Sequence, residues 1–165
     1  MIVTGLLEPA VQARFAALRR AHYPADRNQV PAHISLFHQL PGSQLDAVKR
    51  RLKAVCGALP PPRADITGLK SLGQGVAARI VSPELVAVRD ELAEGWAGLL
   101  IAQDRHGFAP HLTIQNKVTA AEARATLARL ETGFTPIATR IVALALWRYL
   151  DGPWQPLGEI AFRGR

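Results

Sequence analysis

The sequence is poor in cysteine, in long apolar runs and in acidic residues, and the first two shortages exclude whole classes of protein. Cys56 is the only cysteine among 165 residues, which excludes an intramolecular disulfide and a cysteine-cluster zinc site. The longest apolar stretches, 96–102 and 141–147, are far shorter than the ~20 residues that span a bilayer. The N-terminal segment lacks the pattern of a signal peptide. We therefore expect a monomeric cytoplasmic protein without membrane contact.

The shortage of acidic residues leaves an excess of positive charge. Acidic residues number 13 against 20 lysines and arginines, which gives a net charge of +7, and only four of the cationic residues are lysine. Arginine offers a planar fork of donors that suits phosphate, and excess positive charge favours polyanionic partners. A composition rich in Ala, Leu, Arg, Gly and Pro can equally reflect codon bias. The charge therefore has weight only alongside the histidines described below.

Apolar periodicity and turn residues predict alternating strands and helices in an α+β domain. Helices are expected to begin at Pro9 and Pro83, because proline suits a first helical turn, and after the capping residues Ser43 and Thr119. Cys56 lies on the apolar stripe of the second helix and is interpreted as an inert core thiol. The predicted strands span residues 2–7, 33–38, 64–69, 76–81, 111–117, 137–150 and 157–162.

The two halves of the chain repeat the same order of elements at a nearly constant offset. The helix starts at Pro9 and Pro83 are 74 residues apart, the capping residues Ser43 and Thr119 are 76 apart, and two similar motifs are 78 apart. Such an offset indicates an internal duplication. We therefore expect a single domain over 1–165 with repeats of roughly 1–74 and 75–165, folded as a closed α+β body with a pseudo-two-fold axis.

The two motifs are His33-Ile34-Ser35-Leu36 and His111-Leu112-Thr113-Ile114. In each, a histidine stands two positions before a hydroxyl residue. Because side chains alternate between the faces of a strand, the histidine and the hydroxyl share one face and the apolar residues fill the other. A single motif of this kind is common. A matched pair at equivalent places in a repeat points to acid–base chemistry at a shared site.

The segments PAHISLFH and APHLTIQNK resemble the paired HxT/S motifs of the two-histidine (2H) phosphoesterases, in the branch of 2′-5′ RNA ligase-like proteins and RNA 2′,3′-cyclic phosphodiesterases. The resemblance implies a bilobal fold in which two small antiparallel sheets, each backed by helices, flank an open groove. It also implies that His33 and His111 are the catalytic pair and that Ser35 and Thr113 hold phosphate oxygens. Members often carry a basic residue, commonly arginine, shortly after the second motif.

Lys117 is the basic residue that follows the second motif here. Strand alternation would place it, with Gln115, on the face of His111 and Thr113, within reach of phosphate. The same lysine is equally consistent with a solvated strand end. By the same alternation Phe37 shares the face of His33, where it either flanks a base or lines the groove.

Opening a 2′,3′-cyclic phosphate with water requires one proton to leave the water and another to reach the departing ribose oxygen. A neutral imidazole and an imidazolium on opposite sides of phosphorus perform both transfers near neutral pH. Hydroxyl groups donate to the non-bridging oxygens as their charge grows. We therefore expect a metal-independent phosphodiesterase without a cofactor, with 2′-5′ RNA ligase activity in the reverse direction. The sequence does not decide which histidine is the base.

Two other functions remain open from the sequence. The same site suits another small cyclic phosphate, of the ADP-ribose type, and the fold also suits a non-catalytic RNA-binding module. Intact motifs in both halves weigh against a binding module, because binding alone needs no paired imidazoles. The remaining histidines, His22, His38 and His106, are interpreted as structural or solvent-exposed.

Overall fold

A computed structural model describes residues 1–164, in which strands and helices alternate much as the sequence predicts. The strands are β1 (Ile2–Leu7), β2 (Ile34–Phe37), β3 (Arg63–Ser71), β4 (Val76–Val81), β5 (His111–Gln115), β6 (Ile137–Tyr149) and β7 (Trp154–Ala161). The helices are α1 (Pro9–His22), α2 (Leu45–Ala58), α3 (Pro83–Gly95), α4 (Ala102–Arg105) and α5 (Ala120–Glu131). Short 3-10 turns lie at Ala25–Arg27, Gly42–Gln44 and Ala97–Leu99.

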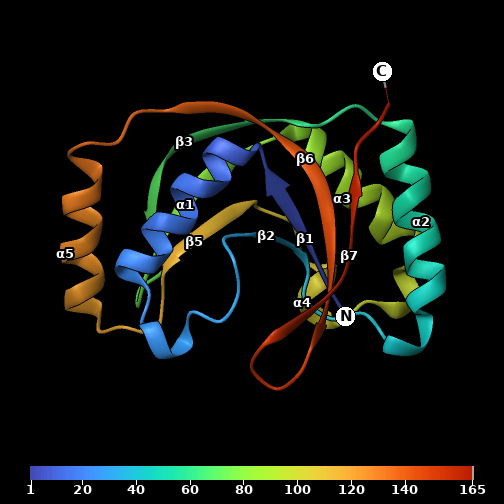
Figure 1. Cartoon of the computed structure of the whole chain (residues 1–165), viewed down its shortest axis with the longest axis horizontal. Coiled ribbons are helices and arrows are strands. Elements are labelled where there is room, and N and C mark those ends of the chain that lie inside the picture. The colour runs from blue at the N-terminus through green and yellow to red at the C-terminus, as the bar shows by residue number, and fades with distance from the viewer. Residues whose placement is uncertain (165) are drawn as a thin grey trace.

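Six of the strands close into a ring, in the order β1-β2-β5-β4-β3-β6, and β6 pairs back with β1. The seventh strand, β7, pairs only with β6 and extends the ring as a hairpin (Figure 1). All of these pairings are antiparallel. The α+β class is therefore confirmed. The two small sheets implied by the resemblance are joined into one ring, through β2–β5 on one side and β3–β6 on the other.

The ring has the symmetry expected of a duplicated chain. If β1 is exchanged with β4, β2 with β5 and β3 with β6, every strand pairing in the ring becomes another pairing of the same ring. The residue pair recorded between β2 and β5 is Ile34 with Leu112, which are 78 residues apart, the same offset as the motifs. This agreement supports our proposal that the chain arose by duplication, with β7 as an addition that has no counterpart in the first half.

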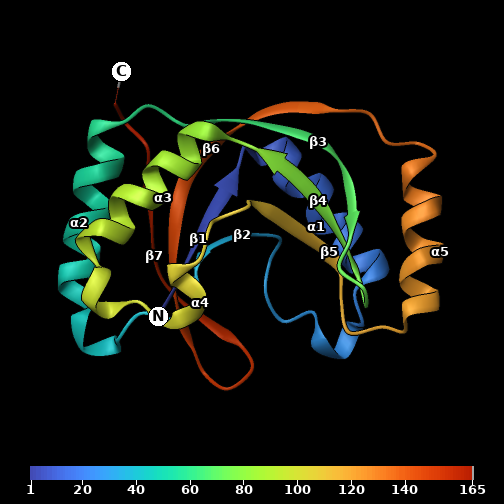
Figure 2. The same ribbon diagram turned by 180° about the vertical axis from the view of Figure 1, so that it is seen from behind.

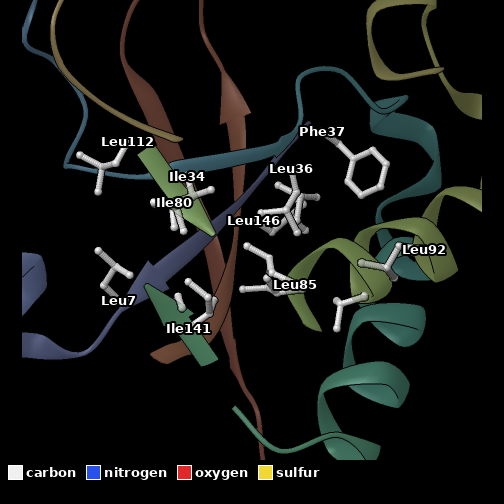
Figure 3. Packing of buried hydrophobic residues seen from close by; sticks show 14 of the residues in the cluster. Leu7, Ile34, Leu36, Phe37, Ile80, Leu85, Leu92, Leu112, Ile141 and Leu146 are labelled. Atoms are coloured by element: carbon white, nitrogen blue, oxygen red, sulfur yellow. The ribbon is translucent and has the colours of Figure 1, made fainter. Parts of the chain in front are cut away.

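Helices cover the ring on two sides, with α1 and α5 on one and α2 and α3 on the other (Figures 1 and 2). Helix α5 packs on β3 and β4, α1 on β5, and α2 on β6 and β7. Figure 3 shows how side chains from the ring meet those of α3 in the core, among them Ile34, Leu112, Ile80, Leu146 and Leu85. The apolar positions of both motifs are therefore anchored in the largest buried cluster of the described chain.

The ends of several elements differ from the predictions. Thr119 caps α5 in a complete capping box with Glu122, as expected, and Ser82 caps α3. The predicted cap at Ser43 is wrong, because a 3-10 turn at Gly42–Gln44 runs directly into α2 and the side chain of Ser43 makes no cap. Two of the predicted strands, 33–38 and 111–117, are shorter in the structure, where they cover 34–37 and 111–115.

Cys56 is fully buried in α2, and burial raises the pKa of its thiol to about 12. A thiol with so high a pKa is not ionised near neutral pH and is a poor nucleophile. The interpretation of Cys56 as a core residue is therefore confirmed. Among residues 1–164, no helix has both the length and the apolar character needed to cross a membrane.

Candidate active site

The two motifs meet where β2 and β5 pair in the ring. Ile34 lies opposite Leu112, so the antiparallel register places His33 opposite Thr113 and Ser35 opposite His111. The two histidines are then diagonal neighbours, whose backbones are typically about 7–8 Å apart. The four apolar motif residues are at most 2% exposed, whereas the histidines and hydroxyl residues are half-buried on the other face. The structure thus brings both motifs together on one surface.

Each imidazole is tethered in the same way. The Nδ1 atom of His33 lies 2.7 Å from the main-chain oxygen of Pro31, and Nδ1 of His111 lies 3.0 Å from that of Ala109. Because a carbonyl oxygen only accepts hydrogen bonds, Nδ1 carries the hydrogen in both rings. The Nε2 atom is therefore the ring nitrogen that is left to accept a proton in each imidazole. In both cases the tether comes from the residue two positions before the histidine, so the two motifs share the same local backbone arrangement.

Burial holds both imidazoles toward the neutral form. It lowers the pKa of His33 to about 4, and the charges of Arg19, His111 and His38 act in the same direction. Burial also lowers the pKa of His111, again with nearby positive groups, Lys70 and His38. An anion placed between the rings would offset these positive charges and raise both pKa values. The site is therefore suited to gaining a proton when a phosphate binds.

Matching irregularities follow the hydroxyl residue in both motif strands. Leu36 is skipped in the pairing of β2 with β1, and Ile114 is skipped in the pairing of β5 with β4. Such bulges leave one residue without a partner and shift the alternation of side chains. As a result Phe37 is fully buried and Gln115 is 5% exposed. The expectation that these two side chains share the face of the histidines is therefore wrong.

The first hollow at this surface, which we call the His33 hollow, has a volume of about 430 Å³. It contains three cationic side chains, Arg19, Arg27 and Lys117, and two carboxylates, Asp26 and Asp151. His33 and Thr113 form part of its wall, together with aromatic side chains that include Tyr23, Tyr149 and Trp154. Cations beside exposed aromatic rings suit the phosphate and base of a nucleotide. Ser35 and His111 share the strand pair but do not line this hollow.

Lys117 reaches the His33 hollow by a different route from the one expected. Strand β5 ends at Gln115, and Lys117 follows it with a φ of 62° and an exposed side chain. Its main-chain N–H donates to the side-chain oxygen of Asn116. The turn, rather than strand alternation, therefore directs Lys117 toward the hollow.

Two residues of the site were not identified from the sequence. Arg19 is 4% exposed and donates to the main-chain oxygen of Thr113 at 2.8 Å and to the side-chain oxygen of Asn28 at 3.1 Å. The ring of Trp154 lies 4.8 Å from that of His33. Arg19 stands in an arginine-rich helix end and Trp154 in a distant hairpin. Neither position carries a local signal that separates it from an ordinary surface or core residue.

Among the described residues, no group of three or more His, Cys, Asp or Glu side chains is arranged to hold a metal ion. The ionisable groups around the motif surface are the two histidines, the cations Arg19, Arg27 and Lys117, and the carboxylates of Asp26 and Asp151. The paired strands thus present two imidazoles and two hydroxyl groups on one surface, and cationic side chains line the His33 hollow beside His33 and Thr113.

Residues 7–153 match the sequence model of the 2′-5′ RNA ligase superfamily. The fold is similar to that of TT0787 of Thermus thermophilus, with a TM-score of 0.69 at 19% identity over 99% of both chains. It is also similar to E. coli LigT solved with NADP+, with a TM-score of 0.61 at 14% identity over 98% of this chain and 96% of that one. LigT solved with 3′-AMP gives 0.56 at the same identity and coverage. No curated protein matches the sequence.

Proposed function

Because the chain belongs to the 2′-5′ RNA ligase superfamily, we propose that it is a phosphodiesterase that opens 2′,3′-cyclic phosphates of RNA ends or nucleotides. The observation that carries the proposal is the symmetric pair of imidazoles, each tethered through Nδ1 so that Nε2 is the reactive nitrogen. The structures of E. coli LigT with 3′-AMP and with phosphate support a nucleotide ligand for this fold.

In the proposed reaction, Nε2 of one neutral histidine takes a proton from water as the water oxygen bonds to phosphorus. The bond from phosphorus to one ribose oxygen breaks, and Nε2 of the other, protonated histidine gives its proton to that oxygen. Ser35 and Thr113 donate hydrogen bonds to the non-bridging oxygens, where negative charge grows. Lys117 holds a phosphate oxygen from the rim of the His33 hollow. An RNA 5′-hydroxyl in place of water would give the 2′-5′ joined product.

The two proton carriers supply the chemistry of the reaction without a Lewis acid, so we propose that it is metal-independent. The product reports how the substrate is oriented. Hydrolysis that leaves a 2′-phosphate places the 3′-oxygen next to the acidic histidine, whereas a 3′-phosphate product reverses that orientation. The cytoplasmic location and the monomeric state inferred from the sequence remain predictions.

A product assay with 2′,3′-cyclic mononucleotides and with RNA ending in a cyclic phosphate tests the function. We expect turnover in the presence of a chelator and a 2′-phosphate product. Turnover that disappears in chelator and returns with a divalent ion would overturn the metal-independent mechanism. Binding without turnover would instead favour the RNA-binding module, and turnover restricted to cyclic phosphates of the ADP-ribose type would favour the other enzyme.

A further inference from the structure

A second hollow lies on the other side of Trp154. We call it the His38 hollow; it has a volume of about 690 Å³, and its walls include His38, Leu40, Gly42, Arg148, Tyr149 and Trp154. Tyr149 and Trp154 face each other across the β6–β7 hairpin and line both this hollow and the His33 hollow. The end of the hairpin therefore forms a wall that the two hollows share, and only the His33 hollow is also lined by motif residues.

The buried carboxylate of Asp104 holds the imidazole of His38 in place. The side chain of Asp104 is 1% exposed, and its Oδ1 lies 2.8 Å from Nδ1 of His38. The carboxylate also accepts hydrogen bonds from the main-chain N–H groups of His38 and Gln39. Arg89, itself buried, donates to the main-chain oxygen of Asp104. These contacts fix the imidazole and leave its Nε2 as the nitrogen available to a ligand.

The His38 hollow favours an anion. Arg148 is exposed, and its recorded side-chain hydrogen bond, to Gln155, is long at 3.5 Å. No acidic residue belongs to its lining in the described part of the chain, and buried Asp104 offsets at most one positive charge. His38 also lies close enough to His33 and His111 to lower both of their pKa values. Because Tyr149 and Trp154 line both hollows, a ligand in this one would lie next to a ligand in the His33 hollow, against the exposed ring of Tyr149.

We propose that the His38 hollow binds a second nucleotide, with His38 and Arg148 on its phosphodiester and Tyr149 against its base. This inference rests on the proposed function and deepens it. A cyclic mononucleotide has a single phosphate and fills one hollow, whereas the last two nucleotides of an RNA fill both. The protein would then select a chain end over a free cyclic nucleotide through a subsite separate from the catalytic histidines.

The test compares kcat/KM for a 2′,3′-cyclic mononucleotide with that for a dinucleotide ending in the same cyclic phosphate. We expect the wild-type protein to favour the dinucleotide at least about tenfold, the size of effect typical of a charged hydrogen bond. Arg148→Gln and His38→Gln should each reduce this ratio severalfold. Losing one phosphate contact should also make the negative slope of log(kcat/KM) against log salt less steep by about 0.7 for the dinucleotide. Arg50→Gln, on the exposed face of α2, is the matched control and should leave the ratio unchanged.

The possible outcomes distinguish a failure of the second subsite from a failure of the proposed phosphodiesterase function. Turnover of both substrates with an equal preference in the wild type and Arg148→Gln would overturn the second subsite and leave the phosphodiesterase intact. If neither substrate is turned over, the proposed function fails. The subsite is then judged by titrating the wild type and Arg148→Gln with a 3′-phosphorylated dinucleotide and with the 3′-phosphorylated mononucleotide. Equal affinities for the dinucleotide in the two proteins would overturn it.

Discussion

The two motif strands have the same backbone design, but their histidines lie in different surroundings. Both imidazoles donate to a carbonyl two residues earlier, and both strands have a bulge directly after the hydroxyl residue. His33, however, lies against Trp154, and its pKa falls to about 4. Trp154 begins β7, the strand without a counterpart in the first half of the chain. The proposed duplication would account for two imidazoles with the same tether, and the additional strand β7 makes their surroundings unequal.

The largest expected effect comes from removing either member of the pair. We predict that His33→Ala and His111→Ala each lower kcat/KM for a 2′,3′-cyclic nucleotide by about 10²–10⁴-fold, because each proton transfer needs its own group. His22→Ala, at the end of α1, is the histidine control and should stay near wild type. Steady-state kinetics at neutral pH measures the losses. Near wild-type activity in either motif variant would end the two-histidine mechanism.

Removal of the hydroxyl groups should have a smaller effect that is similar in the two halves. We predict that Ser35→Ala and Thr113→Val each lower kcat about tenfold with little change in KM, because the hydrogen bonds strengthen as charge develops on the phosphate. The same kinetics, run on both variants side by side, measures the effect. A loss confined to KM would mean that these hydroxyls bind the ground state only. A loss in one variant alone would break the symmetry of the proposed site.

The free energy of unfolding should depend on pH in a way that reveals the unequal surroundings of the two histidines. The ordinary pKa of His33 is 6.5, and burial lowers it to about 4 in the folded protein. The unfolded chain therefore binds the proton more readily, so the stability due to neutral His33 is complete above about pH 6.5 and is lost as the pH falls toward 4. Urea unfolding of wild type and His33→Asn over this range measures the effect, and the variant should show the shallower decline.

His111→Asn serves as the matched comparison for this measurement. The pKa of His111 is lowered in the same direction, so its replacement should also flatten the pH dependence, but less than His33→Asn, which removes the ring beside Trp154. Equal slopes in the two variants would contradict the asymmetry. A wild-type stability that does not change between pH 6.5 and 4 would contradict the lowered pKa of both imidazoles.

The sequence predicted much of this architecture because its signals are local. The alternation around His33 and His111 depends only on neighbouring residues, and so do the helix starts at Pro9 and Pro83. The inward turn of Phe37 and Gln115 was missed because a bulge depends on the partner strand, far away in the chain. Distance in sequence also hid the rest of the site, since Asp104 lies 66 residues from His38 and Arg19 lies 94 from Thr113.

The smallest predicted effect compares the two helix starts that occupy corresponding places in the proposed repeat. Thr119 caps α5 through hydrogen bonds with Glu122 in both directions, so Thr119→Ala should cost about 1 kcal/mol of unfolding free energy. Ser43 stands inside the 3-10 turn that leads into α2 and caps nothing, so Ser43→Ala should change stability by less than about 0.5 kcal/mol. Urea unfolding at pH 7 measures both. Equal losses of unfolding free energy in the two variants would mean that Ser43 caps α2 as Thr119 caps α5. The 3-10 turn at Gly42–Gln44 would then not take the place of a cap.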